Sequence, residues 1–165
     1  MSETRAVGDK PVPAELVAGR VAFVSGGAGT IGAMSSFRLA DHGASVVVAD
    51  IDAERVAAVT ADIQSRGGRA LGIVADLTID GAIEAALAEG ADSLGPIDIL
   101  VNALGHHLAL AGPFEDSTEA GWEALYRVNL LHVMRASRAV IPQMRARGWG
   151  RIVNFSSVEG IRAMP

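Results

Sequence analysis

The sequence predicts an α/β fold with a doubly wound parallel sheet, and three observations support this prediction. Five apolar segments of strand length alternate with amphipathic segments of helix length, a pattern typical of parallel crossovers. A glycine-rich turn, Ser25-Gly-Gly-Ala-Gly-Thr-Ile-Gly32, joins the first strand to the first helix. The second strand, Val46-Val-Val-Ala-Asp50, ends in a carboxylate 18 residues after Gly32. Together these features predict a Rossmann-type sheet with strand order 3-2-1-4-5.

The elements follow one another from residue 20. The predicted strands are 20–25, 44–50, 70–75, 97–102 and 151–155. The predicted helices are 30–42, 53–66, 79–94 and one long helix over 118–147. The second helix carries Val56, Val59 and Ile63 on one face, and the third carries Ile83, Ala86 and Leu87. Gly67-Gly68 and Gly95-Pro96 are expected to end these two helices.

The long helix contains an apolar stripe with residues three to four positions apart. Its members are Trp122, Tyr126, Asn129, Val133, Ser137, Val140 and Met144. Asn129 is therefore expected to face inward, where a buried amide needs hydrogen-bond partners. It either has a specific functional task or is a structural amide that ties the helix to a neighbouring strand. Pro142 is expected to kink this helix or to mark its last turns.

Length and composition limit the classes of protein to consider. A chain of 165 residues, half of them hydrophobic, predicts one domain with a real core and argues against disorder. We expect a flexible leader over 1–18 and a dinucleotide-binding domain over 19–165. The net charge of −5 gives no support to nucleic-acid or membrane binding, and no apolar run approaches the ~18 residues of a membrane span.

Cysteine is absent from the sequence, which excludes a disulfide scaffold and a thiolate zinc site. A reducing compartment is compatible with this composition, and we expect a cytoplasmic protein. Adjacent histidines, His106 and His107, point in different directions and make a poor chelate, so we expect no metal site. They either line a substrate pocket or lie on an exposed loop.

The glycine-rich turn and Asp50 together point to dinucleotide chemistry. Small residues let the backbone approach a pyrophosphate, and a helix N-terminus supplies free N–H donors and positive dipole charge. An acidic residue at the end of the second strand can accept hydrogen bonds from a ribose. Taken separately, the glycines are compatible with an ordinary turn and Asp50 with an ordinary strand-end carboxylate.

From residue 20 to its end, the chain resembles the short-chain dehydrogenase/reductase family. The family's glycine motif matches residues 25–32, with Thr30 in place of the middle glycine. The Thr30 side chain crowds the approach to a phosphate, and its hydroxyl either caps the helix or meets the phosphate. Further landmarks follow in the family's order: Asp76-Leu77, Asn102-Ala-Leu-Gly105, Val128-Asn129, and Gly150-Arg-Ile-Val-Asn-Phe-Ser-Ser157.

This resemblance implies a set of cofactor contacts and two catalytic residues. The implied cofactor-binding residues are Gly26, Gly29, Thr30, Ile31, Gly32, Asp50, Ile51, Asp76, Leu77, Asn102, Ala103 and Gly105. Ser157 is implied to hydrogen-bond the substrate oxygen that changes between carbonyl and alcohol. Asn129 is implied to hold a water in the proton relay.

The family's catalytic tyrosine and lysine have no counterpart in these 165 residues. The only tyrosine, Tyr126, falls inside the long helix, and the only lysine, Lys10, falls in the leader. We therefore expect the chain to be the N-terminal part of such an enzyme, with the C-terminal part missing. We expect it to be inactive alone.

The resemblance implies an NAD-dependent oxidoreductase that moves a hydride between nicotinamide and a secondary alcohol or ketone. Asp50 favours NAD over NADP because its charge would repel a 2′-phosphate. A homo-oligomer, dimer or tetramer, is expected to form through helix 118–147. One alternative is a nucleotide-binding module without turnover. The other is a Rossmann methyltransferase, against which Asn129 and the serine after the fifth strand count.

Overall fold

A computed structural model of the chain describes residues 15–108 and 112–158. Five strands form a parallel sheet in the order β3-β2-β1-β4-β5, which confirms the predicted fold class and topology. The strands are β1 (Val21–Ser25), β2 (Ser45–Asp50), β3 (Arg69–Val74), β4 (Ile99–Asn102) and β5 (Arg151–Asn154). The α-helices are α1 (Thr30–Asp41), α2 (Ala53–Ser65), α3 (Ala82–Leu94), α4 (Glu119–Tyr126) and α5 (His132–Ala146). A 3₁₀ turn, Phe114–Asp116, precedes α4.

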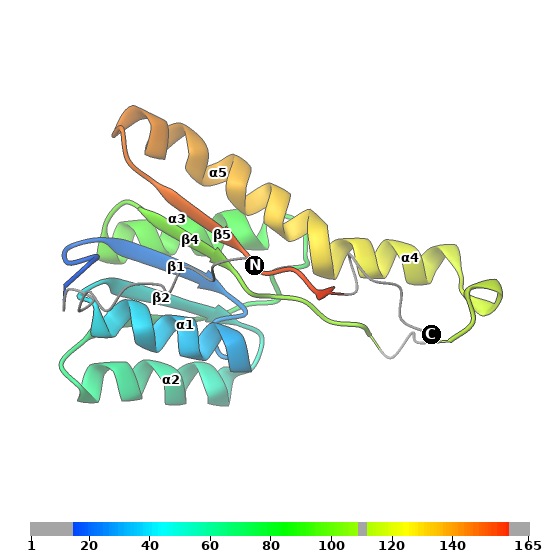
Figure 1. The fold of residues 1–165 in the computed structure, drawn as a ribbon, viewed down its shortest axis with the longest axis horizontal. Coiled ribbons are helices and arrows are strands. Elements are labelled where there is room, and N and C mark those ends of the chain that lie inside the picture. The colour runs from blue at the N-terminus through cyan, green and yellow to red at the C-terminus, as the bar shows by residue number, and fades with distance from the viewer. Residues whose placement is uncertain (1–14, 109–111, 159–165) are drawn as a thin grey trace, which may run out of the picture.

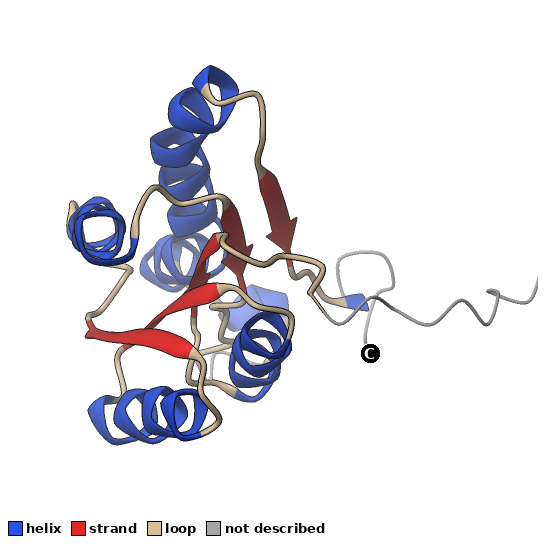
Figure 2. Cartoon of the chain, turned by 90° about the vertical axis from the view of Figure 1, so that its left-hand side faces the viewer, coloured by secondary structure: helices blue, strands red, loops and turns tan. Residues whose placement is uncertain are grey.

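Helices cover both faces of the sheet (Figures 1 and 2). Helices α1 and α2 lie on one face, where the predicted inward residues Val56, Val59 and Ile63 are buried. Helices α3 and α5 lie on the other face, where Ile83, Ala86 and Leu87 are buried as predicted. Strand β1 is buried along its whole length because alternate side chains enter the two cores.

Helix α3 begins three residues later than the sequence predicts. The predicted start at residue 79 is wrong because the segment after β3 forms a turn instead. Asp76 Oδ1 accepts hydrogen bonds from the backbone N–H of Thr78 at 3.0 Å and from its hydroxyl at 2.6 Å. Gly81 then adopts a φ of +81° at the N-cap of α3, which delays the helix to Ala82.

The predicted long helix is interrupted by a π-turn, Arg127–Leu131, between α4 and α5. A π-turn adds one residue, which rotates the preceding face by about 100° relative to a straight α-helix. The buried residues are Val128, His132, Ala136, Val140 and Met144. The prediction that Asn129 faces inward is therefore wrong, whereas the inward positions of Val140 and Met144 are confirmed.

The first described residues form a turn that joins the fold. The N–H of Val17 donates to the carbonyl of His42 at 3.1 Å, and Val17 packs against the core on the side of α1 and α2. The remainder of the predicted leader, residues 1–14, lies outside the described residues. In the described part of the chain, no helix combines the length and apolar character that a membrane span requires.

Candidate functional site

A pocket of about 620 Å³ opens where β1 to β4 end, at the carboxyl edge of the sheet. In open α/β sheets, this edge is where ligands bind. The pocket brings together the predicted cofactor residues Gly26, Gly29, Asp50, Ile51, Asp76, Leu77, Ala103 and Gly105. Thr30, Ile31 and Gly32 stand beside it in the first turn of α1 and do not line it.

Close packing explains the glycines at the first turn. Gly26 has a φ of +67°, and a Cβ there would lie 2.7 Å from the backbone nitrogen of Leu104. A Cβ on Gly32 would collide with the carbonyl oxygen of Gly26. Both glycines therefore let the turn pack against the start of α1 and against the loop after β4.

Gly29, not Thr30, occupies the N-cap position of α1, with a φ of −71° and a ψ of 172°. No side chain caps this helix, so of the two alternatives for the Thr30 hydroxyl, the helix cap is wrong. Thr30 is exposed at the first helical position. The first N–H groups of an α-helix lack helical acceptors, which makes them available to an anion.

Backbone donors orient the Asp50 carboxylate at the pocket. Its Oδ2 accepts from the N–H of Ala28 at 3.1 Å, and its Oδ1 accepts from the N–H of Ile51 at 2.8 Å. These contacts tie the glycine-rich turn to the end of β2. The same Oδ1 also accepts from the N–H of Asp52 at 3.3 Å. A carboxylate accepts about four hydrogen bonds, so Asp50 retains capacity for about one from a ligand hydroxyl.

The end of β3 contributes a self-bonded turn to the pocket. Asp76 holds Thr78 through the two hydrogen bonds described above. Leu77 is buried and packs in the core on the side of α3. The Leu77 side chain is therefore mainly a structural group, although the residue also lines the pocket.

Asn102 uses its side chain within the sheet. Its Nδ2 donates to Asn154 Oδ1 at 2.8 Å, and its Oδ1 accepts from the Ser25 hydroxyl at 3.4 Å. These contacts join β1, β4 and β5 beneath the pocket. Asn102 is fully buried and is not one of the residues that line the pocket.

Asn129 ties the π-turn to the loop after β4. Its Oδ1 accepts from the N–H of His106 at 3.0 Å, and its Nδ2 donates to the carbonyl of His106 at 2.9 Å. The same Nδ2 donates to the carbonyl of Leu125 at 3.0 Å. Asn129 is exposed rather than buried, and its partners lie in the loop after β4 and in α4 rather than in a strand.

Ser157 lies beyond the end of β5 and is exposed. The N–H of Phe155 donates to the carbonyl of Asn102 at 3.0 Å, so the pairing of β4 and β5 continues to residue 155. Because all five strands are parallel, Ser157 stands at the same edge of the sheet as Gly26, Asp50 and Asp76. It is not one of the residues that line the pocket.

His106 lines the pocket, and its ring stacks on that of His107 with the centroids 4.8 Å apart. The expectation that these two side chains point in different directions is therefore wrong. His106 Nδ1 accepts from the N–H of Leu108 at 2.7 Å. Within the described residues, no three histidine, aspartate or glutamate side chains form a group that could hold a metal ion.

Arg127, Thr78 and Leu108 line the pocket and were not predicted from the sequence. Arg127 belongs to the π-turn, and a straight helix would direct it elsewhere. No local sequence pattern could therefore have identified it.

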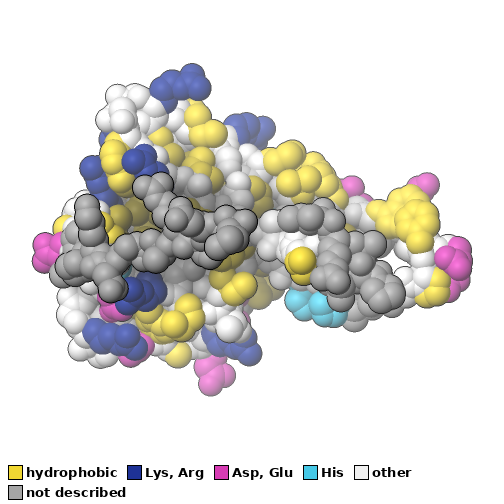
Figure 3. Space-filling model, viewed as in Figure 1, with side chains coloured by type: hydrophobic (Ala, Val, Ile, Leu, Met, Phe, Trp, Pro, Cys, Tyr) yellow, Lys and Arg dark blue, Asp and Glu magenta, His cyan; other side chains and the backbone are white. Residues whose placement is uncertain are grey.

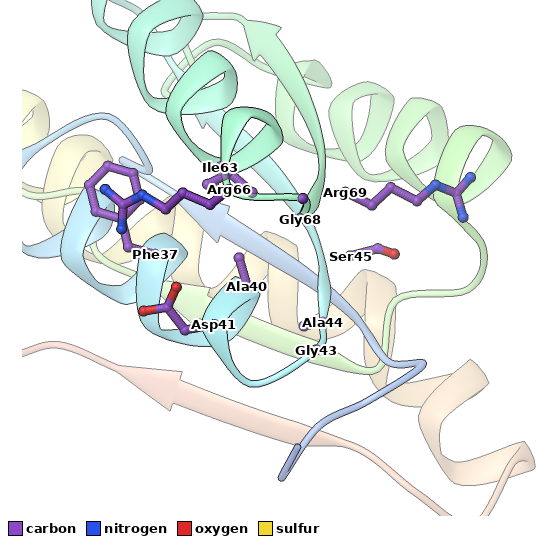
Figure 4. A pocket seen from close by; sticks show the side chains of 11 residues that line it. Phe37, Ala40, Asp41, Gly43, Ala44, Ser45, Ile63, Arg66, Gly68 and Arg69 are labelled. Carbon is purple, nitrogen blue, oxygen red and sulfur yellow. The ribbon is translucent and has the colours of Figure 1, made fainter. Parts of the chain in front are cut away.

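A second hollow of about 420 Å³ lies between α1, α2 and the start of β3, at the opposite edge of the sheet (Figure 4). Its charged groups are already engaged. Arg66 lies over the ring of Phe37 at 4.9 Å and pairs with Asp62, and Arg69 donates to the carbonyl of Ser93 at 3.1 Å. This hollow is not the candidate site.

Comparisons with known proteins agree with this geometry. The family model for short chain dehydrogenases matches residues 20–165. The chain is 39% identical over 138 residues to the (2S)-[(R)-hydroxy(phenyl)methyl]succinyl-CoA dehydrogenase subunit BbsD of Thauera aromatica, covering 84% of this chain and 55% of that protein. It is 41% identical over 142 residues to the short-chain reductase protein NovJ of Streptomyces niveus, covering 84% and 52%. It is 38% identical over 146 residues to the acetoacetyl-CoA reductase of Allochromatium vinosum, covering 87% and 58%.

The chain thus spans about half the length of the curated relatives it matches. The matched residues are those that form the parallel sheet and its pocket, in which the glycine turn, Asp50 and Asp76 meet. On this evidence the chain belongs to the short-chain dehydrogenase/reductase family.

Proposed function

We propose that this chain is the cofactor-binding part of an NAD-dependent oxidoreductase that moves a hydride between nicotinamide and a secondary alcohol or ketone. The main support is the Asp50 carboxylate, held by backbone donors in a pocket beside the glycine turn. The turn supports this proposal because Gly26 and Gly29 line the pocket without side chains, so the backbone is open to a close approach by a pyrophosphate.

The roles of the residues follow from their positions and from the family. The backbone of the glycine turn and the first turn of α1 would hold the pyrophosphate. Asp50 would accept from the ribose next to the adenine, and Asp76-Leu77 would flank the adenine itself. Bound NAD would supply the hydride chemistry. Asn129 would hold a water for proton transfer, and Ser157 would donate to the substrate oxygen.

Charge at Asp50 supports the choice of NAD over NADP. A 2′-phosphate would stand against this carboxylate and be repelled by it. We expect NADH to bind the full-length protein more tightly than NADPH. Asp50→Ala should weaken NADH binding about 10- to 100-fold, because hydrogen bonds to a charged group are lost. The same change should reduce the preference for NADH over NADPH. Fluorescence titration with both cofactors measures this.

Asp52→Ala is the matched control for that titration. Asp52 is two residues away, caps α2 by accepting from the N–H of Arg55 at 3.1 Å, and does not line the pocket. Its loss should cost about 1 kcal/mol of stability and leave the preference for NADH unchanged. Tighter binding of NADPH by the unmodified protein would refute the role of Asp50.

The nucleotide-binding module without turnover remains the alternative proposal. It shares every feature of the pocket and differs only in chemistry, so turnover of NADH by the full-length protein separates the two. The methyltransferase alternative is disfavoured by the family match. Competition between NADH and S-adenosylmethionine for the pocket tests it directly.

We also propose that the protein forms a homo-oligomer through helix 118–147. The support is a row of exposed apolar side chains on α4, the π-turn and α5, some of which are visible over α4 and the first turns of α5 in Figure 3. This row consists of Trp122, Tyr126, Leu130, Met134 and Ile141. Large exposed apolar patches commonly mark protein interfaces, and light scattering of the full-length protein measures the assembly.

A further inference from the structure

Asp80 lies between two arginines, of which Arg127 lines the candidate pocket and Arg135 does not. It stands in the loop that joins β3 to α3, the same loop that carries Asp76 and Thr78. Asp80 Oδ1 accepts from Arg127 Nη1 at 3.0 Å and from Arg135 Nη2 at 2.6 Å. These ion pairs connect the loop after β3 to the π-turn and to the first turns of α5.

The π-turn explains how both arginines reach one carboxylate. Arg127 and Arg135 are eight positions apart, which on a straight α-helix would separate their directions by about 80°. One extra residue in the π-turn reduces this separation to about 20°. The irregular turn therefore brings the two guanidinium groups onto one face, opposite Asp80.

The surroundings of the cluster favour a fixed geometry. The Arg135 side chain is only 18% exposed, and Arg127 is also held by Glu123, whose Oε1 accepts from Arg127 Nε at 2.9 Å. Hydrogen bonds from Arg135 and then Arg127 lower the pKa of the Asp80 carboxyl, which stays ionised. The Asp80 side chain is itself 71% exposed, so solvent screens these pairs and their contribution to global stability is small.

The cluster of Asp80, Arg127 and Arg135 lies at the border of the candidate pocket. Arg127 lines the pocket together with Asp76, Leu77 and Thr78, whereas Arg135 does not. The loop is fixed internally near its start by the bonds between Asp76 and Thr78. Near the end of the loop, just before Gly81 with its positive φ, Asp80 attaches the loop to the π-turn and to α5.

We propose that Asp80, held by Arg127 and Arg135, is a positioning group that fixes the adenine-side wall of the dinucleotide pocket. This inference rests on the proposed function, because that function places the adenine beside Asp76-Leu77. Without the attachment, the loop would have more conformations, and the ligand would have to order it on binding. The effect should therefore be confined to ligands that contain adenosine.

The test compares two variants of the full-length protein. Asp80→Asn keeps the size of the side chain and removes the charge that pairs with both arginines. Glu84→Gln is the matched control because it removes the pair between Glu84 and Arg138, 3.5 Å apart, which joins α3 to α5 away from the pocket. Calorimetric titration with ADP, with nicotinamide mononucleotide and with NADH gives the three affinities.

We expect Asp80→Asn to weaken ADP and NADH binding about 3- to 10-fold, which corresponds to ~0.6–1.4 kcal/mol. Binding of nicotinamide mononucleotide should not change, and KM for NADH should rise at constant kcat. Asp80→Glu should restore part of the affinity. The difference in ADP affinity between Asp80→Asn and the unmodified protein should become smaller in 1 M salt, where the Debye length is about 3 Å. Glu84→Gln should bind all three ligands normally.

Arg135→Gln gives a second, independent test if Asp80→Asn folds poorly. Arg135 is outside the pocket lining and donates to Asp80, so we expect the same selective loss of ADP affinity. Unchanged ADP binding in both variants, or an equal loss for nicotinamide mononucleotide, would overturn this inference alone. If the unmodified protein bound neither ADP nor NADH, the proposed function would fail instead.

Discussion

The two edges of the sheet each carry an aspartate that accepts a backbone hydrogen bond, and the protein uses the two carboxylates differently. At the amino edge, Asp98 is buried and accepts from the N–H of Val21 at 3.2 Å. Arg147 and Arg20 pair with it at 3.2 and 3.7 Å. At the carboxyl edge, Asp50 is half-buried and accepts from the N–H groups of Ala28 and Ile51.

The two aspartates differ in the groups that balance their negative charge. Two guanidinium groups neutralise Asp98, and one of them, Arg20, also lies 3.9 Å from the centre of the Trp149 ring. Asp50 is oriented by amide dipoles in a concave pocket. A carboxylate whose partners are cations stabilises the fold, whereas one oriented by amides and left open to solvent is suited to a ligand.

Glycine substitutions at the two ends of β1 test this contrast with the largest expected effect. Gly26, at the pocket, and Gly19, at the amino edge, both have positive φ, but only Gly26 has backbone atoms within 4 Å of the added Cβ. Gly26→Ala should cost about 3–4 kcal/mol from strain and overlap, and should abolish NADH binding. Gly19→Ala should cost only about 1–2 kcal/mol. Denaturant unfolding measures both, and equal costs would contradict the packing described at Gly26.

Exchange of either aspartate for alanine should separate stability from binding. Asp98→Ala leaves the Val21 N–H without its side-chain acceptor and removes the carboxylate that pairs with Arg147 and Arg20. We expect a loss of about 2–3 kcal/mol of stability with unchanged NADH affinity. Asp50→Ala should change stability by less than about 1 kcal/mol, because water can replace it, and should impair binding. Unfolding curves and titrations on the same two variants provide the comparison. A loss of stability in Asp50→Ala together with a loss of NADH binding in Asp98→Ala would contradict the different roles of the two aspartates.

A smaller effect concerns pH at the pocket edge. His132 is buried beside the loop that carries Leu104, and burial lowers its pKa, an effect that the carbonyls of Leu104 and Val128 partly oppose. Below about pH 6.5, His132 is protonated in the unfolded chain but stays neutral in the folded chain. The free energy of unfolding should therefore fall as the pH is lowered. When the pH is lowered from 7.5 to 5.5, the free energy of unfolding of the unmodified protein should fall by about 1 kcal/mol more than that of His132→Leu. Urea unfolding at both pH values measures this, and parallel losses would exclude His132 as the source.

The parts of the fold that could be predicted depend on local patterns. The alternating faces of β1 and the inward triplet Val56, Val59 and Ile63 follow from periodicity, and the parallel crossovers follow from the order of elements. The meeting of Gly26, Asp50 and Asp76 follows from the same topology, because parallel strands end at one edge.

The parts that could not be predicted depend on tertiary contacts. The π-turn accompanies the bonds of Asn129 to His106 and Leu125, and the helical sequence pattern is compatible with either register. Asn129 was therefore placed on the wrong face, and Arg127 was missed. Asn102 ends a strand beside the pocket, but its bond to Asn154 becomes visible only once β4 and β5 are known to be neighbours.

The placement of β1 at the centre of the sheet also has a consequence for synthesis on the ribosome. Val21 pairs with Asp98, and Ser25 with Asn102, across 77 residues of sequence. At about 5–20 residues per second, the β4 side of β1 stays unpaired for roughly 4–15 seconds after β1 is made. Because β1 is apolar up to Ser25, its open side is then exposed to mispairing and to capture by chaperones.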